Sequence, residues 1–270
     1  MSDLFSVKGK RILITGATSG IGLGGARALV NGGADVIISG RRESGQQIAE
    51  EIGARFIQCD VSDEQDVKRL IEEGAASFEG GKIDALFLNA GKSNTPETIV
   101  DLPFSEMRDL FKVNFDHCYA GIHYAVPYMA EYSSIAVTTS PAANNTTASY
   151  SAYSPSKAAA KMLCRAAAIE LAPYKIRVNS FVPGAVMTEM QHPGKFDYGI
   201  VSQVICGEIR QPDEMGPFFV FMAADASRPM TGAEFVADDG MLAGFSLQAM
   251  TAITEACDVP VEGKEITALL

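Results

Sequence analysis

The chain has 270 residues, of which 47% are hydrophobic, and its formal net charge is -11 at pH 7. This length and apolar content suit one large domain, and a negative chain without runs of Lys or Arg is not expected to bind nucleic acid or an anionic membrane. Its five cysteines are odd in number and far apart, which fits neither a disulfide framework nor a zinc site. No apolar run approaches about 18 residues and the first residues lack a signal-peptide core, so we expect a cytoplasmic protein.

The first predicted strand, residues 11–15, leads into a glycine-rich turn and then a helix. Gly16, Gly20 and Gly22 of this turn would let the backbone bend tightly and approach a pyrophosphate group. The N-terminus of the following helix offers free N–H groups to phosphate oxygens. The spacing is not the GxGxxG of the common dinucleotide fingerprint, so a merely tight connection is the alternative interpretation.

The second predicted strand ends at Gly40, where a dinucleotide-binding fold meets the adenosine ribose. An acidic side chain at this position would accept hydrogen bonds from the ribose hydroxyls, but Arg41 and Arg42 follow the glycine instead. Two guanidinium groups without a carboxylate suit a 2′-phosphate, which predicts NADP(H) in preference to NAD(H). An exposed basic turn is the alternative.

Strands and helices alternate along the rest of the chain. Further strands are predicted at residues 55–61, 83–91, 134–140, 175–184 and 233–240. Because apolar strands alternate with helices, we predict one α/β domain over residues 1–270, a Rossmann-type doubly wound fold with about seven parallel strands and helices on both faces. Residues 185–210 lack a clear period and are predicted to form a substrate lid, and residues 244–270 form a C-terminal extension.

The stretch from Ser140 to Lys157 predicts a proton-transfer site. Ser140 ends a strand, and Tyr153 and Lys157 are four residues apart at the start of a predicted helix, so they share one face of it. The nearby cation should favour the phenolate and lower the pKa of Tyr153 toward working pH. Tyr150 is the comparison, since the residue four positions on is a serine.

Other polar residues give weaker indications. Asn114 interrupts an apolar helical stretch, where it could simply satisfy backbone groups. We expect His117 and His123 to be packed or surface residues of that helix, and His192 to be an ordinary residue of the lid. No cluster of His, Asp or Glu suggests a metal site.

Taken in order, these motifs resemble those of the short-chain dehydrogenase/reductase family over about residues 8–242. Thr15 to Gly22 is similar to the TGxxxGIG motif, Asn89-Ala90-Gly91 to the NNAG motif with Leu88 in place of the first Asn, and Pro183-Gly184 with Thr188 to the PGxxxT segment. The catalytic residues implied by the resemblance are Asn114, Ser140, Tyr153 and Lys157. The implied cofactor contacts are Gly16, Thr18, Ser19, Gly20, Ile21, Gly22, Arg41, Arg42, Asp60, Val61, Asn89, Ala90, Gly91, Tyr153, Lys157, Pro183, Gly184, Val186 and Thr188.

The resemblance also implies a role for each catalytic residue. Tyr153 would be the general acid in carbonyl reduction and the base in alcohol oxidation, while Lys157 would lower its pKa and bind the nicotinamide ribose. Ser140 would position the carbonyl oxygen, and Asn114 would support a proton relay to Lys157 through water. Hydride would come from the nicotinamide, and the partner would be a small carbonyl or alcohol compound.

Two departures from the family pattern concern the substrate side and the end of the domain: Pro141 follows the catalytic serine, and Asp239 replaces the first Gly of a DGG ending. A 3-oxoacyl-thioester reductase is an alternative function, but it would need a basic surface near the lid, where only Lys195 and Arg210 are basic. A cofactor-sensing protein without turnover is the second alternative. We expect a homo-oligomer, a tetramer, paired through the helices near residues 104–130 and 153–172.

Overall fold

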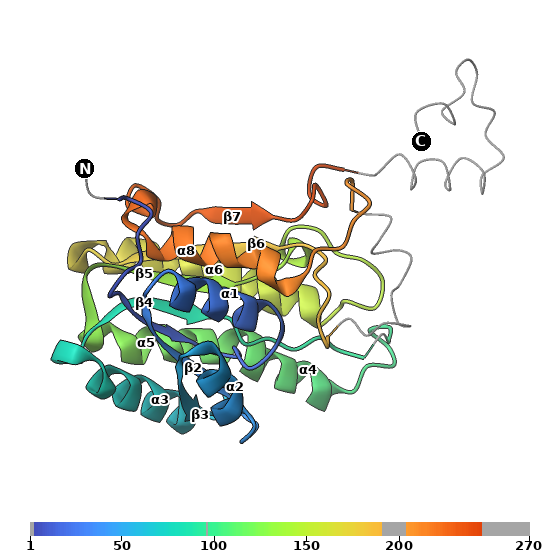
Figure 1. The fold of residues 1–270 in the computed structure, drawn as a ribbon. Coiled ribbons are helices and arrows are strands. Elements are labelled where there is room, and N and C mark those ends of the chain that lie inside the picture. The colour runs from blue at the N-terminus through green and yellow to red at the C-terminus, as the bar shows by residue number, and fades with distance from the viewer. Residues whose placement is uncertain (1–2, 96, 191–203, 245–270) are drawn as a thin grey trace, which may run out of the picture.

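A computed structural model of the protein describes residues 3–95, 97–190 and 204–244. Seven parallel strands form one sheet in the order β3-β2-β1-β4-β5-β6-β7 (Figure 1). The strands are β1 (Arg11–Ile14), β2 (Asp35–Gly40), β3 (Arg55–Gln58), β4 (Ile83–Leu88), β5 (Met129–Thr138), β6 (Arg177–Pro183) and β7 (Glu234–Ala237). The predicted doubly wound α/β fold and its seven strands are confirmed. The lid and the C-terminal extension stay predictions, because residues 191–203 and 245–270 lie outside the described residues.

Helices cover both faces of the sheet (Figure 1). One face carries α1 (Gly20–Asn31), α2 (Gly45–Ile52) and α8 (Gly216–Ala223), and the other carries α3 (Glu64–Ser77), α4 (Phe104–Phe111), α5 (His117–Ala125) and α6 (Tyr153–Leu171). A π-helix, Lys112–Asp116, joins α4 to α5. Short 3₁₀ helices lie at Glu79–Gly81, Val126–Tyr128, Pro141–Ala143, Ala172–Tyr174, Pro212–Met215 and Asp225–Ser227.

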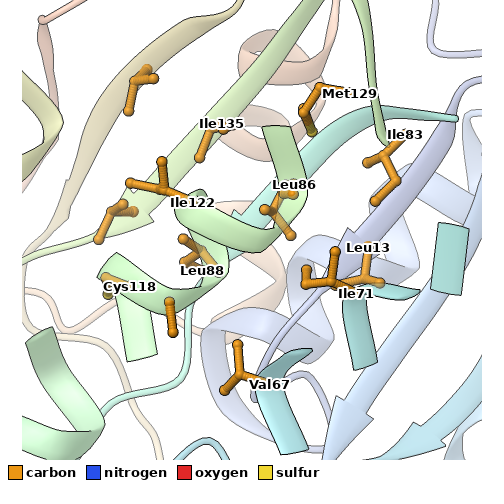
Figure 2. Packing of buried hydrophobic residues seen from close by; sticks show 14 of the residues in the cluster. Leu13, Val67, Ile71, Ile83, Leu86, Leu88, Cys118, Ile122, Met129 and Ile135 are labelled. Atoms are coloured by element: carbon orange, nitrogen blue, oxygen red, sulfur yellow. The ribbon is translucent and has the colours of Figure 1, made fainter. Parts of the chain in front are cut away.

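Two hydrophobic clusters fill the space between the sheet and its helix layers. Successive side chains of a strand point to opposite faces, so Leu13 enters one cluster while its neighbours Ile12 and Ile14 enter the other. Figure 2 shows the first cluster, in which Leu13 of β1 and Leu86 of β4 meet Ile71 of α3. All five side chains are completely buried, and this packing fixes the positions of the strand ends.

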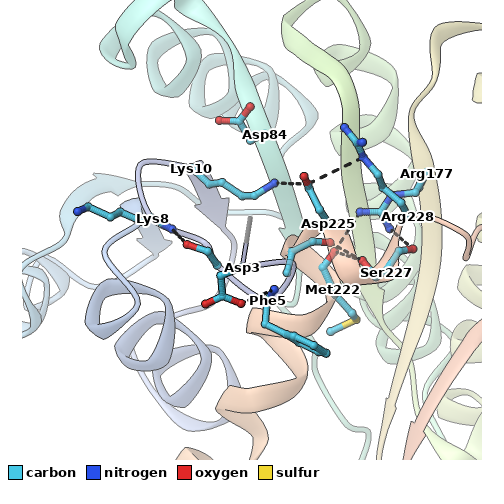
Figure 3. A network of polar contacts seen from close by, with 12 residues as sticks. Asp3, Phe5, Lys8, Lys10, Asp84, Arg177, Met222, Asp225, Ser227 and Arg228 are labelled. Atoms are coloured by element: carbon cyan, nitrogen blue, oxygen red, sulfur yellow. Dashed lines mark hydrogen bonds and ion pairs between the residues drawn. The ribbon is translucent and has the colours of Figure 1, made fainter. Parts of the chain in front are cut away.

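Polar contacts connect the elements at the amino-terminal ends of the strands (Figure 3). Lys10, just before β1, forms an ion pair of 3.0 Å with Asp225, which precedes β7. The buried Arg177 at the start of β6 donates from Nη1 to the carbonyl oxygen of Ser227 at 3.0 Å. These contacts stabilise the amino-terminal ends of the strands. A ligand site is expected at the carboxyl ends, where open parallel sheets bind their ligands.

The helix predicted near residues 104–130 differs from the observed structure in two respects. It contains the π-turn around Asn114, and it ends at Tyr128, so β5 begins at Met129 rather than at residue 134. The physical reason for the early end is Pro127, which sits in a terminal 3₁₀ turn and cannot donate a helical hydrogen bond. The π-turn adds one residue to the helix and places Asn114 in the buried interior.

Candidate functional site

The candidate site lies at the carboxyl edge of the sheet, where the strand order changes direction. β1 pairs with both β2 and β4, so the residues after β1 and β4 flank a topological switch point, the usual place for a ligand in an open parallel sheet. Thr15 follows β1 and Asn89 follows β4. Ser140 comes two residues after β5, and Tyr153 is the first residue of α6, as the sequence predicted.

The glycine-rich turn lies directly against the end of β4. Gly16 has a φ of +62°, and a Cβ atom at this position would lie 2.7 Å from the Cα of Ala90, so only glycine fits. The Asn89 side chain donates from Nδ2 to the carbonyl oxygens of Thr15 at 3.2 Å and of Gly16 at 3.0 Å. The turn and the Asn89–Gly91 segment therefore form one backbone cradle, as a close-lying pyrophosphate requires.

Helix α1 starts at Gly20 with Ser19 as its N-cap, and the Ser19 side chain makes no capping hydrogen bond there. The first N–H groups and the positive end of the helix dipole thus point to the cradle. These features suit the phosphates of a dinucleotide, and the cofactor contacts expected from Thr18 to Gly22 stay a prediction.

The end of β2 carries the two arginines expected to select the cofactor. A Cβ atom on Gly40 would lie 2.7 Å from both Oγ1 and Cγ2 of Thr18, so a larger residue would have to displace that side chain. Arg41 and Arg42 are exposed. Arg42 donates from Nη2 to Glu189 Oε2 at 3.2 Å, which joins this turn to the segment after β6.

The segment after β3 holds Asp60 and Val61, the residues expected to contact adenine. Asp60 Oδ1 accepts hydrogen bonds from the backbone N–H of Ser62 at 3.0 Å and from its hydroxyl at 2.8 Å. Val61 is buried, with 8% of its surface exposed. Asp60 is thus held rigidly at the carboxyl end of the sheet, on the same side as the arginines.

Asn114 makes three hydrogen bonds in the buried interior. Its Oδ1 accepts from the Lys92 N–H at 2.9 Å, and its Nδ2 donates to the Lys92 carbonyl at 2.9 Å and to Ser156 Oγ at 3.0 Å. The backbone-satisfying role considered for this residue is therefore real. The same bonds hold the chain after Gly91 beside α6, so they also organise the site.

Lys157 is buried and lies close to Asn114. Its Nζ donates to the Thr138 carbonyl at 2.8 Å and lies 6.0 Å from the centre of the Tyr153 ring. A Cβ atom on Gly91 would lie 3.2 Å from Lys157 Nζ and 3.6 Å from Asn114 Oδ1, so both side chains meet at this glycine. Burial lowers the pKa of Lys157 to about 8, and the neighbouring Cys118 partly opposes this shift.

The predicted direction of the Tyr153 pKa shift is wrong in this structure. Part of the side chain is accessible to solvent, yet burial around the phenol raises its pKa to about 12, opposed by a hydrogen bond with Ser140 and reinforced by Tyr150. The physical reason is that Lys157 Nζ donates to the Thr138 carbonyl and lies 6.0 Å from the centre of the Tyr153 ring. Desolvation therefore outweighs the attraction of the cation. The Tyr150 ring packs edge-on against Tyr153, with 5.3 Å between the ring centres.

The chain after β6 lies across the glycine-rich turn. The backbone of Gly184 donates to the Ala237 carbonyl at 2.9 Å, and Val186 forms a bridge with Arg210 that closes the base of the predicted lid. Thr188 Cγ2 lies against Gly20, close enough to be 3.2 Å from a Cβ atom placed there. The Pro183–Thr188 segment thus reaches the cradle, where the resemblance expects it.

Comparisons with known proteins agree with this geometry. The family model described as enoyl-(acyl carrier protein) reductase matches residues 16–242. The chain belongs to the short-chain dehydrogenase/reductase family. Members of this family are oxidoreductases of alcohols and ketones that use NAD(P).

Three similar proteins place the chain within this family. The chain is 32% identical over 252 residues to a (+)-cis,trans-nepetalactol synthase of Nepeta racemosa, which covers 87% of the chain and 92% of that protein. It is 32% identical over 250 residues to an NADP-dependent (R)-specific alcohol dehydrogenase of Lentilactobacillus kefiri, covering 88% of the chain and 98% of the relative. The crystal structure of a short-chain type dehydrogenase/reductase from Mycobacterium marinum superposes with a TM-score of 0.83 at 32% identity, over 90% of this chain and 99% of that one.

Sequence reasoning missed several residues that shape this short-chain dehydrogenase/reductase site. His117 is buried against Thr15, Thr138 receives the Lys157 hydrogen bond, and Glu189 pairs with Arg42. Only His117 gave a signal, because a histidine in an apolar helix, three residues after Asn114, requires polar partners. His123 is exposed, as expected for a surface residue, and His192 lies outside the described residues.

The described residues contain no group of three or more His, Cys, Asp or Glu side chains able to hold a metal ion. Across the same part of the chain, no helix has the length and apolar character needed to cross a bilayer.

Proposed function

We propose that this protein is an NADP(H)-dependent oxidoreductase that reduces a ketone or oxidises a secondary alcohol, with Tyr153, Ser140, Lys157 and Asn114 as its reacting end. The observation that carries the proposal is the meeting of Tyr153, Ser140 and Lys157 at the carboxyl edge of the sheet, next to a glycine-rich cradle. The bound nicotinamide would supply or accept the hydride.

The chain's own part is proton transfer and orientation. In reduction, the Tyr153 hydroxyl gives its proton to the carbonyl oxygen while Ser140 holds that oxygen in place. Burial raises the pKa of this phenol to about 12, so at neutral pH it keeps the proton that reduction requires. In oxidation, the same oxygen must first lose its proton, so oxidation should become faster as pH rises.

The preference for NADP(H) rests on the arrangement after β2. Arg41 and Arg42 are exposed and directly follow the strand end where the adenosine ribose would lie, and Gly40 leaves no room for a carboxylate. Arginine recognises phosphate through paired, charge-assisted hydrogen bonds. The NADP-dependent relative from Lentilactobacillus kefiri lends support to this preference.

The thioester-reductase alternative depends on a basic surface for an acidic carrier. Arg210 at the base of the predicted lid bonds to the Asp239 carboxylate at 2.8 Å and lies 3.4 Å from both Glu208 and Glu214. Its charge is therefore neutralised by its neighbours, which favours a small carbonyl compound over a carrier-bound substrate. Lys195 lies outside the described residues.

We also propose a cytoplasmic homotetramer. Large apolar side chains on the outer faces of α5 and α6 support the assembly, since Tyr119 and Met162 are each 57% exposed and Ile169 is 77% exposed. Light scattering at micromolar concentration tests it, and a monomer would contradict it.

The test of the function is turnover with a panel of small ketones, using NADPH and NADH separately and following the absorbance of the reduced nicotinamide. We expect turnover with NADPH, more weakly supported by NADH. Binding of NADPH without oxidation of the cofactor across the panel would favour the sensing protein. Equal dissociation constants for both cofactors would contradict the NADP(H) preference.

A further inference from the structure

A buried hydrogen-bond chain joins the helix that carries Asn114 to the cofactor cradle, and His117 is its centre. His117 is the first residue of α5 and has 1% of its surface exposed. Its Nδ1 lies 2.8 Å from the Val113 carbonyl oxygen, and its Nε2 lies 3.1 Å from Thr15 Oγ1. Thr15 is completely buried as well, so neither group can exchange these partners for bulk water.

The partners fix the direction of each hydrogen bond. A carbonyl oxygen can only accept, so Nδ1 must carry the proton and donate to Val113. A neutral imidazole then has a bare Nε2, which accepts the Thr15 hydroxyl proton. The oxygen of that hydroxyl is left free to accept the backbone N–H groups of Asn89 at 3.0 Å and Ala90 at 3.2 Å.

We propose that His117 is a positioning residue that fixes the turn from Asn89 to Gly91 by holding the Thr15 hydroxyl in the accepting orientation. Without this acceptor, the Thr15 proton would turn to another buried group, such as the Phe87 carbonyl at 3.4 Å. The consequence is a rigid link between the π-turn at Asn114 and the backbone beside which the cofactor would lie. Only the effect on cofactor affinity rests on the proposed function.

The charged and titratable groups around His117 keep it neutral. Burial lowers the pKa of His117 to about 4, the bond to Val113 opposes this shift, and the Lys157 cation adds to it. The thiol of Cys118 lies 3.6 Å from Nδ1, and burial raises the pKa of Cys118 to about 12, so it carries no charge at neutral pH. His117 therefore stays neutral around neutral pH, and the directions of its hydrogen bonds do not change there.

The first test is nitrogen NMR of the imidazole in a variant that keeps only this histidine, His123→Gln with His192→Gln. We expect one neutral ring protonated at Nδ1 and unchanged down to about pH 5.5. A ring protonated at Nε2, or one that titrates near its ordinary pKa of about 6.5, would overturn the proposal. This measurement requires no cofactor and leaves His117 itself unaltered.

The second test is a double-mutant cycle of His117→Leu and Thr15→Val, read by hydrogen exchange at the Asn89 and Ala90 amides and by NADPH titration. In the parent protein, we expect His117→Leu to speed hydrogen exchange at these amides and to weaken NADPH binding about 3- to 10-fold. In the Thr15→Val background, the same substitution should change the exchange rates and the NADPH affinity by less than about twofold. His117→Gln, which can place an amide near the Nε2 position, should retain affinity within about twofold.

Additive losses in the cycle, or equal losses from the Leu and Gln variants, would mean that His117 only fills space and would overturn the positioning role. If the parent protein bound neither NADPH nor NADH, the proposed function would fail. The ring tautomer and the exchange rates would still decide whether His117 fixes the turn.

Discussion

Two regions at the same edge of the sheet differ in how far water reaches their charged groups. One is the arginine turn after β2, residues 40–42, and the other is the buried cluster of Asn114 and Lys157. In the turn, the Arg42 and Glu189 side chains are 60% and 64% exposed, so water and salt screen their attraction. In the cluster, Asn114 and Lys157 are almost fully buried. The Asn114 amide donates to the Lys92 carbonyl, and the Lys157 ammonium donates to the Thr138 carbonyl.

This contrast separates two tasks. A buried cluster with hydrogen bonds to backbone carbonyls is costly to rearrange, so it suits a fixed reacting geometry and shifts pKa values. An exposed ion pair costs little to break, so it can exchange one anionic partner for another. Substitutions in the cluster should therefore change the chemistry strongly, while substitutions in the turn should change cofactor choice moderately.

The largest effect is expected from Tyr153→Phe. The ring packing survives, but the group that protonates the alkoxide is lost, so the single-turnover rate of NADPH oxidation should fall by roughly 10²–10⁴ with cofactor affinity nearly intact. Tyr150→Phe is the matched control, because its ring lies against Tyr153 while its sequence position offers no lysine four residues on. If Tyr150→Phe abolished turnover and Tyr153→Phe spared it, the assignment of the catalytic tyrosine would be wrong.

The second effect concerns the exposed turn. Arg41→Ala should weaken NADPH binding by about 1–3 kcal/mol, since a charge-assisted contact to the 2′-phosphate is lost, and should leave NADH binding nearly unchanged. Isothermal titration with both cofactors measures the difference. Arg55→Ala is a suitable control, because Arg55 is an arginine with a side chain that is 40% exposed, but it lies at the start of β3 and pairs with Asp35 at 2.7 Å. A similar loss for both variants would indicate a general charge effect.

The third effect concerns Lys157 of the buried cluster and the free energy of unfolding. Lys157 has its pKa lowered from 10.5 to about 8 by burial, so between these values the unfolded chain binds more protons than the folded one. The free energy of unfolding therefore rises with pH across this window, and the cost of the buried charge is fully present below about pH 8. Lys157→Met should be inactive yet more stable than the parent by about 1–3 kcal/mol at pH 7.

Denaturant unfolding of both proteins at pH 7 and at pH 10 measures that advantage, which should shrink as pH rises. Taking the difference between the two proteins cancels the titration of other groups, such as the buried cysteines. A constant difference across the window would mean that the folded protein does not depress the pKa of this lysine.

The two regions also differ in how well the sequence predicted them. The positions of Ser140, Tyr153, Lys157 and the glycine-rich turn follow from local patterns, because parallel strands end at one edge and residues four apart share a helix face. The pKa of Tyr153 could not be predicted in this way, since it depends first on burial by the tertiary packing and then on the hydrogen bond with Ser140 and the neighbouring Tyr150. The pairs His117 with Thr15 and Arg42 with Glu189 join residues 102 and 147 positions apart, beyond the reach of any spacing rule.

The smallest expected effect would sharpen the comparison most. Glu189 competes for Arg42 with any anion that arrives at the turn, so Glu189→Gln should free the guanidinium and tighten NADPH binding about 2- to 5-fold at low salt. The gain should vanish at high salt, because both groups are exposed, and NADH binding should not change. Glu208→Gln removes the same charge from an exposed residue that pairs with Arg210 instead. An equal gain in that control would assign the effect to net charge, whereas weaker NADPH binding in Glu189→Gln would mean that the carboxylate holds Arg42 ready for the phosphate.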